Sequence, residues 1–386
     1  MIYLDHNATT PLLPEVVEAM LPYLTTHFGN PSSAHAYGRA AKEAVEKARA
    51  QVASLVSGAS ANDVIFTSGG TEATALALKG TLPLGESGGV RERLVSTNVE
   101  HPATARVLDA LERSGHEVIR LKVKTNGLLD LAQVDASLAP FPGGAAGLKP
   151  SARWLSVIHA HNETGVLQPL DALHRLTQKH GTLLHADASQ SAGKVALALA
   201  DCDLVTLAAH KLYGPKGVGA LIKRSDVTLH AQQLGAGHER GLRAGTENVA
   251  SIVGFGAACV AAVRDLEANA RKLLALRERL ETKLRSEIPG LVIAAERSPR
   301  LPNTTYALFP GVTGNALLSR ASLLAASTGS ACHDGHDEAP AVLLALGVDA
   351  RLAVGAVRLT TGRHTEEADI DASVANLRDA WAFLKR

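Results

Sequence analysis

The pattern with the clearest chemical potential in this chain is a His-Lys pair that follows directly on a predicted strand. The apolar residues 204–207 predict a buried strand, and the small residues Ala208 and Ala209 let another backbone approach closely. His210 and Lys211 come next, and no carboxylate stands beside Lys211 in the sequence. A buried lysine of this kind most often forms an imine with a carbonyl cofactor. A lysine on a surface loop would fit this stretch equally well. Other parts of the sequence are therefore needed to distinguish an imine-forming lysine from a surface lysine.

A second pattern predicts a seat for a phosphate group. Residues 64–67 predict a strand, the Ser-Gly-Gly-Thr run at 68–71 a tight turn, and residues 72–79 a helix. Converging backbone N–H groups at Gly70, the helix dipole and the Thr71 hydroxyl would all favour a phosphate there. The lysine that follows the last glycine in a nucleotide-binding P-loop is absent. Many turns of this type bind nothing, so this pattern is also ambiguous alone.

Polar side chains follow five of the predicted strands. Alternating strands and helices predict a mostly parallel sheet with helices on both faces, and ligands gather at the carboxyl ends of such strands. A single histidine at a strand end is more often a structural residue. Five polar side chains at one edge favour a shared binding site. They are Thr71, His101, Asn162, Asp187 and Lys211, after runs at 64–67, 94–97, 154–159, 182–186 and 204–207.

Composition predicts a globular protein in the cytoplasm. The 39 basic and 38 acidic residues leave a net charge of +1, which gives no overall attraction to nucleic acid or to an anionic membrane. We find no signal peptide and no run of about eighteen apolar residues. Three cysteines are too few for a disulfide framework, which fits a reducing compartment. Cys202 and Cys259 lie in apolar stretches and are expected in the core.

Two domains are expected, joined by a long helix. Residues 246–286 predict a helix that is apolar first and charged later, as expected for an element that bridges two domains. We expect a large domain at 14–258 and a smaller α+β domain formed by 1–13 and 259–386. The Pro-, Gly- and Ala-rich stretch 139–151 predicts an exposed connection within the large domain.

Taken in order, these motifs resemble the cysteine desulfurases and the related selenocysteine lyases. These are pyridoxal-phosphate enzymes of the class V aminotransferase group. The resemblance implies the α/β fold type I of such enzymes: a large domain with a mostly parallel seven-stranded sheet flanked by helices, plus a smaller α+β C-terminal domain. The matching stretches cover nearly the whole chain, at 3–12, 28–35, 66–72, 100–102, 162–165, 187–190, 210–219, 239–248, 328–332 and 357–363.

The resemblance also implies a role for each residue around pyridoxal 5′-phosphate. Lys211 would form the internal aldimine, and Asp187 would pair with the ring nitrogen so that the ring can accept electrons. Gln190 would donate a hydrogen bond to the 3′-oxygen, and His101 would stack on the ring and carry protons. An obligate homodimer is implied, because one phosphate ligand comes from the neighbouring subunit. The implied phosphate ligands are Gly70, Thr71, His210 and, from that neighbour, Thr246.

For the substrate, the resemblance implies that Asn162 and Arg358 bind the carboxylate. Cys332 would act as the thiolate that receives sulfur as a persulfide. From the residues alone, a packed cysteine or a metal site with His333 and His336 would be equally acceptable readings of Cys332. The resemblance favours catalysis and implies no metal.

Two departures from the family pattern affect cofactor binding and substrate choice. Desulfurases commonly carry a phosphate-binding serine two residues before the histidine of the His-Lys pair, and Ala208 stands there instead. His333 and His336 follow Cys332 as in selenocysteine lyases, where housekeeping desulfurases usually have Thr and Ser.

We therefore expect a desulfurase that converts L-cysteine to L-alanine and passes the sulfur from Cys332 to an acceptor protein. A selenocysteine lyase on the same scaffold is the nearest alternative. A plain aminotransferase or β-lyase would use no persulfide. A binding scaffold that recruits partners through the 246–286 helix would leave the polar strand ends unexplained.

Overall fold

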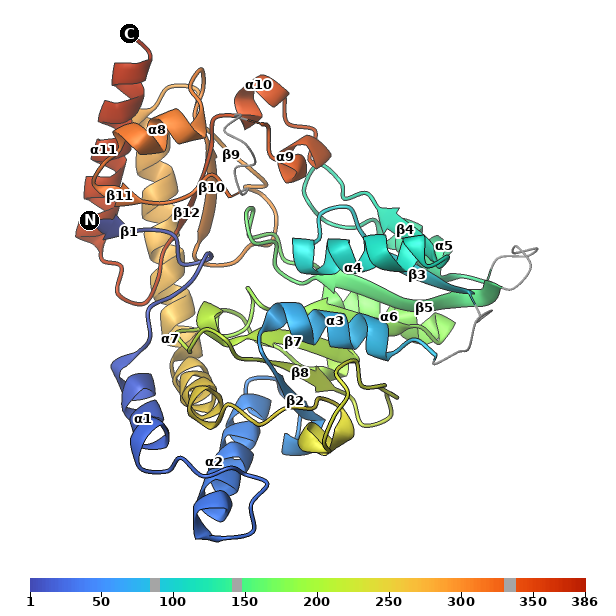
Figure 1. Ribbon diagram of the computed structural model, residues 1–386. Coiled ribbons are helices and arrows are strands. Elements are labelled where there is room, and N and C mark those ends of the chain that lie inside the picture. The colour runs from blue at the N-terminus through green and yellow to red at the C-terminus, as the bar shows by residue number, and fades with distance from the viewer. Residues whose placement is uncertain (84–90, 141–147, 330–337) are drawn as a thin grey trace.

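The computed structural model describes residues 1–83, 91–140, 148–329 and 338–386. Its centre is a seven-stranded sheet (Figure 1). In spatial order the strands are β2 (Val64–Thr67), β8 (Gly219–Lys223), β7 (Leu204–Ala208), β6 (Leu183–Asp187), β5 (Leu148–Ile158), β3 (Arg91–Thr97) and β4 (Glu117–Leu121). Within this sheet β8 runs antiparallel to both of its neighbours, and the remaining pairs are parallel. The expected mostly parallel sheet is confirmed.

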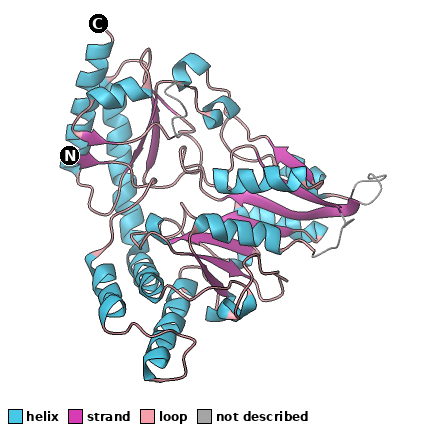
Figure 2. Cartoon of the chain, viewed as in Figure 1, coloured by secondary structure: helices cyan, strands magenta, loops and turns pink. Residues whose placement is uncertain are grey.

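Helices cover both faces of this sheet (Figure 2). Helices α3 (Gly70–Gly80) and α4 (Pro102–Arg113) lie side by side over one face, and α5 (Leu131–Leu138) and α6 (Leu170–His180) over the other. Helices α1 (Pro14–Thr25) and α2 (Ala36–Ala53) pack against the first part of α7 (Val249–Glu287). The central strand β7 is buried along its whole length and is mostly apolar, as expected of a strand covered on both faces. The edge strand β2 is equally buried.

A smaller sheet lies near the C-terminus, with strand order β12-β10-β9 and antiparallel pairing. A short parallel pair, β1 with β11, accompanies it and brings the N-terminal residues to this part of the molecule. The elements are β1 (Ile2–Tyr3), β9 (Val292–Ile293), β10 (Thr304–Leu308), β11 (Leu324–Ala325), β12 (Ala356–Thr360), α8 (Gly314–Arg320), α9 (Ala341–Ala345), α10 (Ala350–Ala353) and α11 (Glu367–Leu384).

Helix α7 contributes to two separate hydrophobic cores. Ile252 and Phe255 belong to the core under the large sheet, whereas Leu276 and Leu280 belong to the core of the smaller sheet. By length and composition α7 could cross a membrane, but 56% of its most apolar window is buried inside the fold. Such burial is typical of a helix at the centre of a protein core. The domain boundaries that we expect at 13/14 and 258/259 stay predictions.

The stretch 139–151 was expected to be an exposed connection over its whole length, and this expectation is wrong for its last residues. Strand β5 already begins at Leu148, where that residue pairs with Arg91 at the start of β3. Pairing with a neighbouring strand supplies backbone hydrogen bonds that local composition does not reveal.

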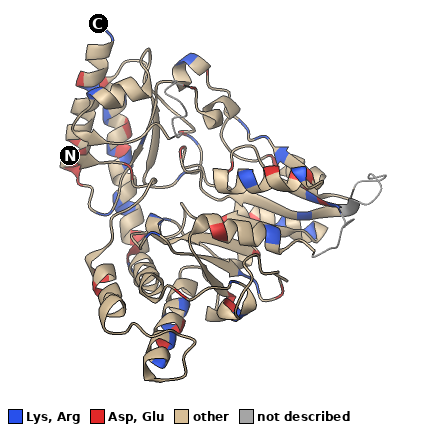
Figure 3. Ribbon diagram, viewed as in Figure 1, with Lys and Arg blue, Asp and Glu red and all other residues tan. Residues whose placement is uncertain are grey.

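Charged residues of both signs are interspersed along the helices (Figure 3).

Candidate active site

A cavity of about 210 Å³ lies at the carboxyl edge of the large sheet. Besides Ala103, Ile158, Ser189 and Ala208, its lining contains eight of the residues singled out from the sequence. Parallel strands end at the same edge, so side chains far apart in the chain converge there. The eight are Gly70, Thr71, His101, Asn162, Asp187, Gln190, His210 and Lys211.

Lys211 lies in a short 3₁₀ turn, Ala209–Lys211, that directly follows β7. Its Nζ atom donates to the carbonyl oxygens of Asn7 at 2.6 Å and Ala8 at 2.9 Å. Burial lowers the pKa of Lys211 to about 8, and the positive charge of Arg358 adds to this effect. A larger fraction of this amine is therefore unprotonated near neutral pH than in an ordinary lysine, as a nucleophile requires.

The carboxylate and the imidazole of the site are each held by a backbone N–H. Asp187 is buried at the end of β6, and its Oδ1 accepts from the backbone N–H of Ser189 at 3.0 Å. His101 caps α4 by accepting from the Ala103 N–H at its Nδ1, at 3.1 Å. Partial removal from water lowers the pKa of His101, although the residue keeps an exposed surface. The neutral ring then carries its proton on Nε2.

The start of α3 provides the predicted phosphate seat. Gly69 precedes the helix with a φ of +156°, which L side chains rarely adopt, and Gly70 and Thr71 form its first turn. A Cβ added at Gly70 would come within 3.0 Å of the Ser189 hydroxyl oxygen, so the glycine keeps this wall of the cavity open. His210 Nδ1 lies 3.1 Å from the Thr9 hydroxyl. Burial lowers the pKa of His210 to about 4.

The residues present fit pyridoxal phosphate. A helix N-terminus with glycine suits the phosphate, a carboxylate faces the same cavity, and an amine with a lowered pKa completes the set.

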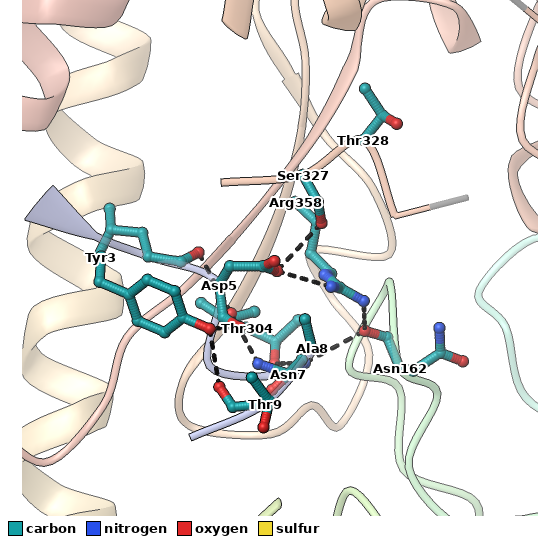
Figure 4. Close-up of polar contacts among 12 residues, drawn as sticks. Tyr3, Asp5, Asn7, Ala8, Thr9, Asn162, Thr304, Ser327, Thr328 and Arg358 are labelled. Carbon is teal, nitrogen blue, oxygen red and sulfur yellow. Dashed lines mark hydrogen bonds and ion pairs between the residues drawn. The ribbon is translucent and has the colours of Figure 1, made fainter. Parts of the chain in front are cut away.

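Arg358 lies on β12, beside the residues that line this cavity. Its Nη2 donates to Asp5 Oδ1 at 2.7 Å and its Nη1 to the Asn162 carbonyl oxygen at 3.1 Å. Asp5 Oδ1 also accepts from the Ser327 hydroxyl at 3.1 Å (Figure 4). The guanidinium is buried, and among the described residues its Nε has no hydrogen-bond partner. Arg358 itself lines neither this cavity nor the larger one beside it, so the structure brings it next to Asn162 but not to the cavity wall.

A second cavity of about 520 Å³ shares His101 and Asn162 with the first. Gly329 and Glu338, which flank the segment 330–337, both line this cavity. Cys332, His333 and His336 themselves lie outside the described residues. Glu100 also lines the second cavity, and burial raises its pKa to about 8.

Thr246 is exposed and is not part of the lining of the cavity that holds Lys211. Within this chain the structure therefore does not bring Thr246 together with the other predicted phosphate ligands. Cys202 and Cys259 are buried, as expected for core residues. Among the described residues, no group of three or more His, Cys, Asp or Glu side chains could hold a metal ion.

Sequence reasoning missed three residues that hold the site together. Asn7 accepts from both Lys211 and Gln190 through its carbonyl oxygen, Asp5 binds Arg358, and Lys194 donates to the Gln190 carbonyl oxygen at 2.8 Å. Asn7 and Asp5 lie in the polar N-terminal stretch that matched the family. The sequence around Lys194 did not indicate a role at the site, apart from its position four residues after Gln190.

A family profile described as "Aminotransferase class-V" matches residues 2–372. The chain belongs to the class-V aminotransferase family. Within this family, "Cysteine desulfurase IscS" from Anaeromyxobacter sp. (strain Fw109-5) is 44% identical over 375 residues, covering 96% of this chain and 90% of the relative. The resemblance inferred from the motifs is confirmed.

Solved structures share the architecture of this chain. A structure described as "NIFS-LIKE PROTEIN" is 32% identical with a TM-score of 0.88, and the match covers 99% of both chains. A structure titled "SspA in complex with cysteine" is 28% identical with a TM-score of 0.79, covering 93% of this chain and 98% of that chain. The expected fold type is confirmed.

Proposed function

We propose that this protein is a pyridoxal-phosphate-dependent cysteine desulfurase that converts L-cysteine to L-alanine and retains the sulfur on Cys332 as a persulfide. The observation that carries the proposal is the convergence of Lys211, Asp187 and His101 on one cavity beside a helix N-terminus. Relatives across nearly the whole chain that bear the name cysteine desulfurase support this reaction.

When bound, the cofactor supplies an aldehyde for an amine and a ring that withdraws electrons from the substrate. Asp187 would hold a proton on the ring nitrogen, and Gln190 would donate to the ring oxygen through its Nε2. Gly70, Thr71 and His210 would hold the phosphate, with Thr246 of a second copy of the chain completing the seat. His101 would stack on the ring and, with Lys211, move protons at the substrate carbons.

The substrate carboxylate would bind Arg358 and the Asn162 side chain. A guanidinium suits a planar carboxylate, and the SspA structure with cysteine supports an amino-acid substrate on this fold. The Cys332 thiolate would attack the substrate sulfur, so that an S–S bond forms as the Cβ–S bond breaks. The electron pair stays on carbon, which takes a proton to give alanine.

Borohydride treatment of the cofactor-saturated protein tests the cofactor site. We expect a pyridoxyl adduct on Lys211 by peptide mass spectrometry, and none in Lys211→Ala. A folded, cofactor-saturated protein without this adduct would contradict the proposal.

Cys332→Ser should keep the adduct and the absorption near 420 nm that pyridoxal imines show, but lose alanine formation from L-cysteine. Full activity in this variant would show that no persulfide forms on Cys332.

A selenocysteine lyase is the second candidate, because His333 and His336 follow Cys332. Turnover of L-cysteine and L-selenocysteine, each with the wild type and Cys332→Ser, separates the two. Cleavage of the Cβ–S bond of L-cysteine needs the Cys332 thiolate, so a desulfurase should lose its turnover of L-cysteine in Cys332→Ser. A selenocysteine lyase should turn over L-selenocysteine in preference to L-cysteine. Transfer of the persulfide sulfur to an acceptor protein and a homodimeric assembly are part of the same proposal.

A further inference from the structure

Among the described residues, none forms a hydrogen bond with the hydroxyl group of Ser189. The residue lines the cavity that contains Lys211, and its side chain is partly accessible there. Its backbone N–H donates to Asp187, but its hydroxyl makes no hydrogen bond to any described residue. A hydroxyl left free at the wall of a binding cavity is available to a ligand.

This hydroxyl faces the first turn of α3. The point that a Cβ on Gly70 would occupy lies 3.0 Å from the Ser189 oxygen and 3.3 Å from the Ala208 Cβ. Ser189 and Ala208 therefore border the same small space, one from the end of β6 and one from the end of β7. Ala208 contributes no hydrogen-bonding group there.

Thr71 in this turn is already a proposed phosphate ligand, and the nearby hydroxyls of Thr206 and Thr67 have partners within the fold. Thr206 Oγ1 lies 2.9 Å from His185 Nε2 and accepts from the Thr74 hydroxyl at 3.3 Å. Thr67 Oγ1 donates to the Gly69 carbonyl oxygen at 2.9 Å. A phosphate at this helix end needs donors beyond the backbone N–H groups, and Ser189 can supply one without losing an existing bond.

We propose that the Ser189 hydroxyl donates to the cofactor phosphate and supplies, from β6, the contact that Ala208 cannot make from β7. The inference rests on the proposed function, because it assumes pyridoxal phosphate in this cavity. Ser189 then serves both ends of the cofactor: its N–H holds Asp187 for the ring, and its hydroxyl binds the phosphate.

Three variants test this assignment: Ser189→Ala, Ala208→Ser and the double variant. Ser189→Ala removes only the hydroxyl and keeps the N–H that holds Asp187. Cofactor-free protein is titrated with pyridoxal phosphate by absorbance, with pyridoxal, which lacks the phosphate, and with inorganic phosphate as a competitor of pyridoxal phosphate.

In Ser189→Ala we expect pyridoxal phosphate and inorganic phosphate to bind about tenfold more weakly or worse, as for loss of a hydrogen bond to a charged group. Pyridoxal should bind as in the wild type. The double variant should recover most of the lost affinity, because a hydroxyl returns to the same space from the other strand.

Unchanged binding of both phosphate-bearing probes in Ser189→Ala would overturn the inference. Equal weakening of pyridoxal would also overturn it, because it would show general damage to the cavity. Failure of the proposed function itself would look different, since the wild type would then form no borohydride-trapped adduct on Lys211.

Discussion

Lys194 and Lys211 are two lysines close to the same site, and burial lowers the pKa of both. The value for Lys194 falls to about 7 and that for Lys211 to about 8. Lys194 is almost fully buried and donates to the carbonyl and, at 3.4 Å, to Oε1 of Gln190. Folding therefore disfavours the charged forms of these amines, and this cost depends on pH.

Stability of the cofactor-free protein should rise between pH 7 and about pH 10, where an unfolded lysine still binds its proton and these folded lysines do not. Below about pH 7 the cost of burial is fully present. Lys194→Met should show a smaller rise, measured as the thermal midpoint at pH 7 and at pH 9.5.

The matched control for Lys194→Met is Lys122→Met at an exposed position, which should follow the wild type. An identical rise in Lys194→Met and the wild type would show that Lys194 carries its charge in the folded protein up to pH 10.

At the scale of elements, the turn before α3 depends on its contact with β8. A Cβ added at Gly219 would lie 2.6 Å from the Gly69 carbonyl carbon and 2.6 Å from the Leu207 oxygen. Both are backbone atoms, which no side-chain rotation can move away. A side chain at position 219 would therefore collide with both the turn before α3 and the strand before Lys211.

Gly219→Ala should therefore separate β8 from the turn, weaken binding of pyridoxal phosphate by at least about tenfold and lower the thermal midpoint, since overpacking costs about 1–3 kcal/mol. Gly237→Ala is the control, because an added Cβ there meets no atom within 4 Å. Wild-type affinity in Gly219→Ala would show that the turn is not set by this contact.

Much of the site could be predicted from sequence, because parallel strands place their ends at one edge whatever their spacing in the chain. Asp187 and Lys211 follow apolar runs, so their position needed no tertiary information. Lys194 and Asp5 could not be predicted to act at the site, because each acts through a contact with another segment. The pairing of β1 with β11, which brings Asp5 to Arg358, has no local signal either.

At the scale of the whole molecule, the segment before α7 is anchored firmly but presents Thr246 outward. Arg49 binds Glu239 through two hydrogen bonds of 2.7 and 2.8 Å, and Arg243 binds Glu72. An exposed Thr246 close to these ion pairs fits the proposal that it serves the site of a second copy of the chain.

Mixing two defective variants tests this proposal. Lys211→Ala should be inactive and Thr246→Ala should bind cofactor weakly. A heterodimer of the two would contain one site with an intact lysine and an intact threonine, so we expect activity to return after mixing under subunit exchange at limiting cofactor. No gain over the separate variants, with exchange verified by differently tagged subunits, would place Thr246 in its own chain's site or in none.

The N-terminal segment determines when this site can exist during synthesis. Asn7 and Thr10 bind Lys211 and His210, and Asp5 binds Arg358. These early residues leave the ribosome long before the strands that they join. In a growing chain Lys211 is solvated and carries its proton like an ordinary lysine, because the burial that lowers its pKa comes only with folding. The contact between Asp5 and Arg358 needs residue 358 to have emerged, so only a nearly finished polypeptide offers the vitamin-derived aldehyde its mature setting.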